Sequence, residues 1–147
     1  MIEKFIIKSK LPKELTKLDL WWADGLQGAR WCKCDIPYCP TTSEKLPNRL
    51  ISISKAKTIH NKAMRSGDVN YHIHAFVHCY VYDQHFDGKR NSIWDNKEKY
   101  LDLLKHFDGA ITPDFSTFAD FPDPIQRYNT LRMRAMGYYL GRMVSPL

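Results

Sequence analysis

The sequence predicts an α/β domain with a small, mostly parallel sheet, and three observations support this prediction. Short segments rich in β-branched and aromatic residues alternate along the chain with longer segments of helical period. The 147 residues are enough for one hydrophobic core. The 44% of hydrophobic residues and 26% of charged residues are typical of a folded globular protein. Alternating strands and helices favour parallel strands joined by right-handed crossovers.

The first third of the chain lacks this regular alternation. We expect residues 1–47 to form an irregular N-terminal arm and residues 48–147 to form the α/β domain. The arm is rich in tryptophan and is interrupted by glycine and proline, and no hydrophobic period runs through it.

The first strand and the first helix are predicted directly after the arm. Arg49–Ser54 alternates apolar and small polar residues and is expected to be a strand. Ser54 is expected to cap a helix that ends before Gly67. The segment Tyr71–Tyr82 is rich in aromatic and β-branched residues and contains no glycine or proline, so it predicts the second strand.

A second helix is predicted from Asp95 to Gly109. Asp95 and Glu98 have the spacing of a capping box, and glycine is common just past a helix end. Gly109–Thr112 is expected to be a short third strand, which Pro113 ends.

The last helix is expected to start near Pro122–Pro124, because proline is tolerated in a first helical turn. Met143–Leu147 is expected to begin a further strand. The predicted order is therefore βαβαβα, in a small open sheet or in part of a barrel.

Ligands of such folds bind at the loops that follow the carboxyl ends of the strands. This rule selects Asp83 after the second strand, and Asp114 and Ser116 after the third. Carboxylates at the ends of neighbouring strands could converge on one ligand or catalytic centre, and no specific role is assigned to them. A structural alternative is that Asp114 forms an ion pair with Arg132 or Arg134.

The segment DGAITPDFSTFADFPDPIQRYNTLRMRAMGYYLGR, residues 108–142, carries a more specific pattern. It resembles the central motif of domain-of-unknown-function family 4417, which occurs in bacteria, archaea and their phages. The matching positions are Pro113, Asp114, Phe115, Ser116, Asp120, Pro122, Asn129, Arg132 and Arg134.

The resemblance covers residues 46–142 and implies a fold and a set of positions, but no reaction. Asn129 and Arg132 lie three apart on a helix and could bind one carboxylate or phosphate group. Family members continue beyond the last helix, so this chain is expected to be a short or C-terminally truncated member. The family often has two adjacent acids after the second strand, whereas Tyr82 precedes the single Asp83 here.

The stretch YHIHAFVHCYVYDQHF, residues 71–86, supports a second hypothesis. His72 and His74 form a His-hydrophobic-His pair, which metal-dependent enzymes that nick single-stranded DNA use with a tyrosine nucleophile. The candidate nucleophiles are Tyr128, Tyr138 and Tyr139. Those enzymes carry the pair in an antiparallel sheet, so the predicted parallel sheet favours a polar strand face without metal.

The cysteines of WCKCDIPYC have two explanations. Cys32, Cys34 and Cys39 could give three thiolates to zinc, with Cys79 or a histidine as the fourth ligand. Their spacing is not that of a paired C-x2-C site, so free thiols are favoured, and no metal ligand is assigned.

The net charge of +6 makes nucleic acid or another phosphate-containing ligand a reasonable partner. The run from Lys45 to Gly67 carries six cations and no acid. A non-catalytic basic module that binds nucleic acid is therefore a third hypothesis, and solvated helix faces explain the same charges more simply. Whether the protein is an enzyme, and whether it uses a cofactor, stays open.

The sequence also predicts where the protein works and how it assembles. No apolar run reaches the ~18 residues of a membrane helix, so we expect a cytoplasmic protein. An unpaired edge of the sheet would favour a homodimer.

Overall fold

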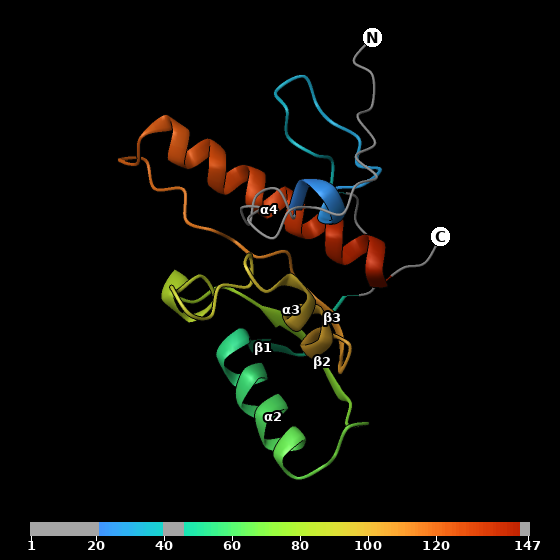
Figure 1. The fold of residues 1–147 in the computed structure, drawn as a ribbon. Helices are drawn as coiled ribbons and strands as arrows, with labels where there is room; N and C mark the ends of the chain where they lie inside the picture. The colour runs from blue at the N-terminus through green and yellow to red at the C-terminus, as the bar shows by residue number, and fades with distance from the viewer. Residues whose placement is uncertain (1–20, 40–45, 145–147) are drawn as a thin grey trace.

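The structure is a computed structural model that describes residues 21–39 and 46–144 (Figure 1). Strands and helices alternate along the described chain, as the sequence predicts. The elements are η1 (Trp21–Gly25), β1 (Leu50–Ser52), α2 (Ile53–Arg65), β2 (Ile73–His78), η2 (Asp83–His85), α3 (Lys97–Leu104), β3 (Phe107–Ala110) and α4 (Asp123–Val144).

The three strands form an open parallel sheet in the order β1-β2-β3. This confirms the predicted fold class, in its open-sheet form. Ile51 pairs with Val77 across β1 and β2, and Val77 pairs with Ala110 across β2 and β3. β1 and β3 are the edges of this sheet. Dimerisation through an edge stays a prediction.

The first strand is shorter than predicted because the following helix begins earlier. β1 ends at Ser52, and the helix cap is Ser52 rather than Ser54: its side-chain oxygen accepts the backbone N–H of Lys55 at 3.3 Å. α2 ends at Arg65, before Gly67, as predicted. Gly67 has a φ of 77°, a left-handed conformation that favours glycine.

The second strand is also shorter than predicted, at Ile73–His78, but its two faces are as expected. Ala75 and Val77 are buried, whereas His74 is exposed. The alternation follows from the two-residue period of a strand. Asp83 therefore lies in the short helical turn η2 rather than directly at the strand end.

The third strand begins two residues earlier than predicted, and the helix before it ends earlier. α3 ends at Leu104, and its N-cap is Asn96 rather than the predicted Asp95; the Asn96 side chain makes no capping bond. Phe107 is buried and pairs with Ile73, which places β3 at Phe107–Ala110 instead of Gly109–Thr112. Gly109 lies inside this strand, where a Cβ atom would come within 2.8 Å of the Phe76 ring.

The last helix starts at Asp123, as predicted from the prolines. Met143 and Val144 belong to this helix, so the strand expected at Met143–Leu147 is wrong for these two residues. Residues 145–147 lie outside the described part of the chain. No helix of the described residues is long and apolar enough to cross a membrane. The cytoplasmic location stays a prediction.

The sheet lies between α2 and α4 (Figure 1). α2 and α3 pack against each other and against the strands. Trp21 of η1 is 1% exposed and stacks on Trp94, with Tyr139 of α4 against its edge. The described part of the arm thus contributes a side chain to the main core. The division of the chain at residue 47 stays a prediction.

Candidate functional site

The turn after β2 and the loop after β3 are joined at the carboxyl edge of the sheet. The Asp83 carboxylate accepts two hydrogen bonds from Ser116: Oδ1 from the hydroxyl at 2.8 Å and Oδ2 from the backbone N–H at 3.1 Å. A carboxylate that accepts a backbone N–H and a hydroxyl holds a loop in one conformation. Asp83 and Ser116 therefore form one structural unit, as the carboxyl-edge rule suggested.

This unit continues into α4 through a buried asparagine and arginine. Asn129 donates its side-chain N–H to the Ser116 carbonyl and accepts from Arg132 Nη2 at 2.7 Å. Arg132 Nη1 donates to Asp87 Oδ2 at 2.7 Å, and its guanidinium lies 4.0 Å from the centre of the Phe115 ring. Both Asn129 and Arg132 are buried. The network positions the loop that carries Ser116.

An open pocket of about 730 Å³ adjoins this network. Asp83, Asp114 and Ser116 line it together with aromatic side chains that are unusually accessible. Tyr82 is 81% exposed, and Tyr80 and Phe118 are each 59% exposed. The Phe118 and Phe121 rings meet edge to face, with centroids 5.2 Å apart. The carboxyl-edge pocket, as we call it, thus combines aromatic surface with carboxylates.

Asp114 differs from the other polar residues of the carboxyl-edge pocket. Its side chain is exposed, and no hydrogen bond or ion pair joins it to the described residues. Both oxygens of Asp83, in contrast, are already bonded to Ser116. Asp114 is consequently the carboxylate that is free to accept a hydrogen bond from a ligand.

A thiol lines the carboxyl-edge pocket, and a lysine lies beside it. Burial raises the pKa of Cys79 to about 11, so this thiol stays protonated at neutral pH and is a poor nucleophile. Lys57 of α2 donates from Nζ to the carbonyl oxygen of His85 at 2.9 Å, which places a cation beside the pocket. Partial burial lowers the pKa of Lys57.

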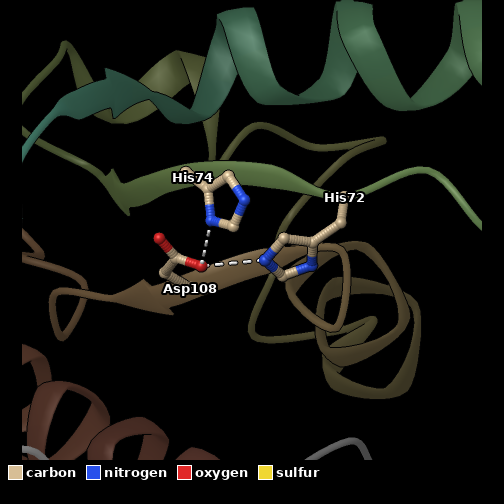
Figure 2. Close-up of side chains that lie close together, drawn as sticks. All are labelled: His72, His74 and Asp108. Atoms are coloured by element: carbon tan, nitrogen blue, oxygen red, sulfur yellow. Dashed lines mark hydrogen bonds and ion pairs between the residues drawn. The ribbon is translucent and has the colours of Figure 1, made fainter.

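A second cluster lies near the amino ends of β2 and β3. His72 Nε2 and His74 Nδ1 lie 2.8 Å and 3.2 Å from the same Asp108 oxygen (Figure 2). Hydrogen bonds from His72 and His74 lower the pKa of Asp108. All three residues are exposed, and their ligand atoms lie within 4.8 Å of one another. We call these three residues the His-Asp cluster.

Comparison with known proteins places the chain in a family. The sequence pattern of a family described as a domain of unknown function, DUF4417, matches residues 31–144. The chain belongs to the DUF4417 family. The Gene 1 protein of Mycobacterium phage L5 is 33% identical over 63 residues, which are 43% of this chain and 26% of the phage protein. The chain therefore matches about a quarter of that relative's length. No solved structure matches the chain.

Four of the five site residues predicted for this DUF4417 domain lie in one hydrogen-bonded network: Asp83, Ser116, Asn129 and Arg132. Asp114 lines the carboxyl-edge pocket but lies outside the network. The structural alternative for Asp114 was an ion pair with Arg132 or Arg134. No such pair occurs among the described residues: Arg132 pairs with Asp87, and Arg134 is exposed. Whether these residues bind a ligand stays a prediction.

Sequence reasoning missed Asp87, the partner of Arg132, and Asp108 of the His-Asp cluster. Asp87 lies in a loop without hydrophobic period, where no local signal distinguishes it. Asp108 follows the buried Phe107 in a strand, and the two-residue period therefore turns it to the opposite face. That alternation was the available signal, but it becomes useful only once β3 is placed correctly.

The tyrosines of the DNA-nicking hypothesis have contacts away from the histidines. Tyr138 donates its hydroxyl to the Gln27 carbonyl at 2.8 Å. Tyr139 is buried against Trp21, and the Tyr128 ring packs on Trp94. The histidines lie on a parallel sheet. The nicking hypothesis stays a prediction, with the His-Asp cluster as the feature of the structure that bears on it.

The cysteines of the arm depart from the expectation of free thiols. Cys32 and Cys34 form a disulfide, so they cannot supply thiolates to zinc in this state. Cys39 is free and packs against Gly137 of α4. Burial raises the pKa of Cys39, which keeps it in the thiol form.

Proposed function

We propose that this DUF4417 domain is a phage or mobile-element protein that binds single-stranded nucleic acid, with one base held in the carboxyl-edge pocket. The observation that carries the proposal is the pocket itself: exposed aromatic rings line it together with Asp114, a carboxylate that has no partner among the described residues. The relative in Mycobacterium phage L5 supports the phage setting.

The aromatic side chains of the carboxyl-edge pocket can stack on a base. Proteins that bind single strands stack bases on aromatic rings, and this stacking tolerates any base. Tyr80 and Tyr82 come from the segment after β2, and Phe118 and Phe121 come from the loop after β3. A base between these two segments would bury apolar surface that is otherwise in water.

Charged groups in and near the pocket can bind the polar parts of a nucleotide. Asp114 can accept a hydrogen bond from a base amino group, as acidic side chains do from cytosine. Lys57 stands beside the pocket, and the outer face of α2 carries a further open hollow that includes Lys62 and Arg65. This face belongs to the segment from Lys45 to Gly67, which carries six cations and no acid. Lys62 and Arg65 follow Lys57 by five and eight residues along α2, so their charges can bind phosphates further along the same strand.

The network behind the pocket supports the same role. Asp83, Asn129 and Arg132 use their polar atoms within the protein and fix the loop that carries Ser116. A rigid loop reduces the entropy lost when a ligand is bound. These residues are therefore assigned to positioning, and the contacts with nucleic acid are assigned to Asp114, to the aromatic rings and to the cations of α2.

Fluorescence anisotropy with a labelled single-stranded oligodeoxynucleotide of mixed sequence tests the proposal. Tyr82→Ala and Phe118→Ala are each expected to weaken binding roughly 5- to 150-fold, because stacking contributes about 1–3 kcal/mol per base. Both side chains are largely exposed, so neither change should disturb folding. Tyr38→Ala is the matched control, since Tyr38 is an exposed tyrosine that does not line the pocket.

The dependence on salt separates a pocket from general electrostatic binding. Lys62→Gln with Arg65→Gln is expected to reduce the salt dependence of affinity, because fewer counterions are released. The proposal fails if Tyr82→Ala and Phe118→Ala bind the oligonucleotide with unchanged affinity while the double charge variant binds it more weakly. The protein would then bind phosphates through α2, and the pocket would take no base.

A further inference from the structure

We propose that the His-Asp cluster binds a divalent transition-metal ion, of which Zn²⁺ is the best match. The ion would be held by His72 Nε2, His74 Nδ1 and Asp108 Oδ1 (Figure 2). The site lies near the amino ends of β2 and β3, whereas the carboxyl-edge pocket lies beyond their other ends. The cluster shares no residue with the proposed nucleic-acid contacts.

The spacing of the three atoms is already close to that of metal ligands. A tetrahedral ion with its ligands at 2.0–2.1 Å holds them about 3.3 Å apart. Here Asp108 Oδ1 lies 2.8 Å from His72 Nε2 and 3.2 Å from His74 Nδ1. The three atoms lie within 4.8 Å of one another, so a modest ring rotation would complete the geometry. The His74 side chain is 86% exposed and is free to make that rotation.

The fold explains how these residues meet. His72 and His74 are two apart and extend from the same face of the chain. Parallel pairing of Ile73 with Phe107 places Asp108 beside His74. The register of β2 and β3 shifts between Ile73 and Phe76, as at a β-bulge. Bulges re-aim side chains and are common beside functional sites.

The chemistry of the ligands selects the class of metal. Imidazole nitrogen binds zinc, copper, nickel and iron well, whereas magnesium and calcium prefer oxygen ligands. A set of two histidines and one carboxylate occurs in zinc and iron sites that keep positions open to water or substrate. Asp108 and the two histidines share hydrogen bonds in the structure, and a metal ion would replace the protons in those bonds.

Isothermal titration with Zn²⁺, and absorption spectra with Co²⁺, test this site in the full chain. We expect one ion per chain and a cobalt spectrum without thiolate charge-transfer absorption, because no cysteine belongs to the cluster. Asp108→Asn and His74→Ala should each weaken binding by more than about tenfold, since even the loss of an outer-shell partner costs about 10- to 100-fold.

His78→Ala is the matched control, because His78 lies on the same strand but outside the cluster. It should bind Zn²⁺ as the unaltered protein does. All three cluster residues are exposed, so far-ultraviolet circular dichroism should show that the variants remain folded. The inference is overturned if no ion binds at one per chain, if Asp108→Asn and His74→Ala bind as tightly as the unaltered protein, or if cobalt binding shows thiolate absorption.

Discussion

Replacing Trp21 with alanine is expected to lower the free energy of unfolding by about 3–5 kcal/mol, the range for large aromatic residues removed from a core. Trp21 stacks on Trp94 with ring centroids 4.0 Å apart, and its indole N–H donates to the Trp94 carbonyl oxygen at 2.8 Å. The Tyr139 ring packs against it edge to face, with centroids 5.6 Å apart. Alanine would leave a cavity among these rings. Urea denaturation followed by far-ultraviolet circular dichroism measures the change.

Two further variants separate packing from hydrogen bonding. Trp21→Phe keeps an aromatic ring but loses the indole N–H, so a smaller loss is expected. Leu46→Ala should change stability by less than about 0.5 kcal/mol, because Leu46 is 90% exposed. Trp21 precedes residue 31, where the family match begins. A loss below about 1 kcal/mol for Trp21→Ala would mean that η1 does not pack on the core in solution.

Asp87→Ala is expected to destabilise the protein by about 3–5 kcal/mol, because it leaves the buried charge of Arg132 without its partner. The side chains of Arg132 and Asp87 are only 10% and 17% exposed, and Nη1 lies 2.7 Å from Oδ2. Asp87 also accepts a hydrogen bond from the Ser92 hydroxyl at 2.9 Å. Chemical denaturation of both proteins at neutral pH measures the difference.

An exposed ion pair provides the control for this charge effect. Asp102→Asn removes the partner of Lys105 on α3, where both side chains are well exposed, and should cost less than about 1 kcal/mol. Combining Asp87→Asn with Arg132→Met should cost less than the two changes added together, since no buried charge is then left unpaired. Strict additivity in that double variant would contradict the coupling of Asp87 and Arg132.

Local patterns predicted the elements of the fold better than their boundaries. Gly67 ended α2 as expected, and the prolines near residue 123 began α4. The predicted third strand starts too late because the sequence pattern makes Gly109 a helix end. In the structure the burial of Phe107 against the sheet outweighs that local preference, and Gly109 provides the space for the Phe76 ring.

The candidate site was predictable where a general rule of parallel sheets applied. That rule placed Asp83 and Ser116 together, since both follow the carboxyl ends of neighbouring strands. It could not find Asp108, because its contact with His72, 36 residues away in sequence, depends on how β2 and β3 pair. It also could not show that both carboxylate oxygens of Asp83 accept hydrogen bonds from Ser116, while Asp114 has no partner in the described part of the chain.

A titration of the ¹⁵N-labelled protein with an unlabelled single-stranded oligodeoxynucleotide, followed by amide NMR spectra, tests the central claim most directly. If a base enters the carboxyl-edge pocket, the largest shifts will occur in residues 79–85 and 114–121, the two segments that supply its lining side chains. Smaller shifts are expected along α2, where phosphates would bind. Shifts confined to α2, or spread over surfaces away from the pocket, would contradict the assignment of the carboxyl-edge pocket as the binding site.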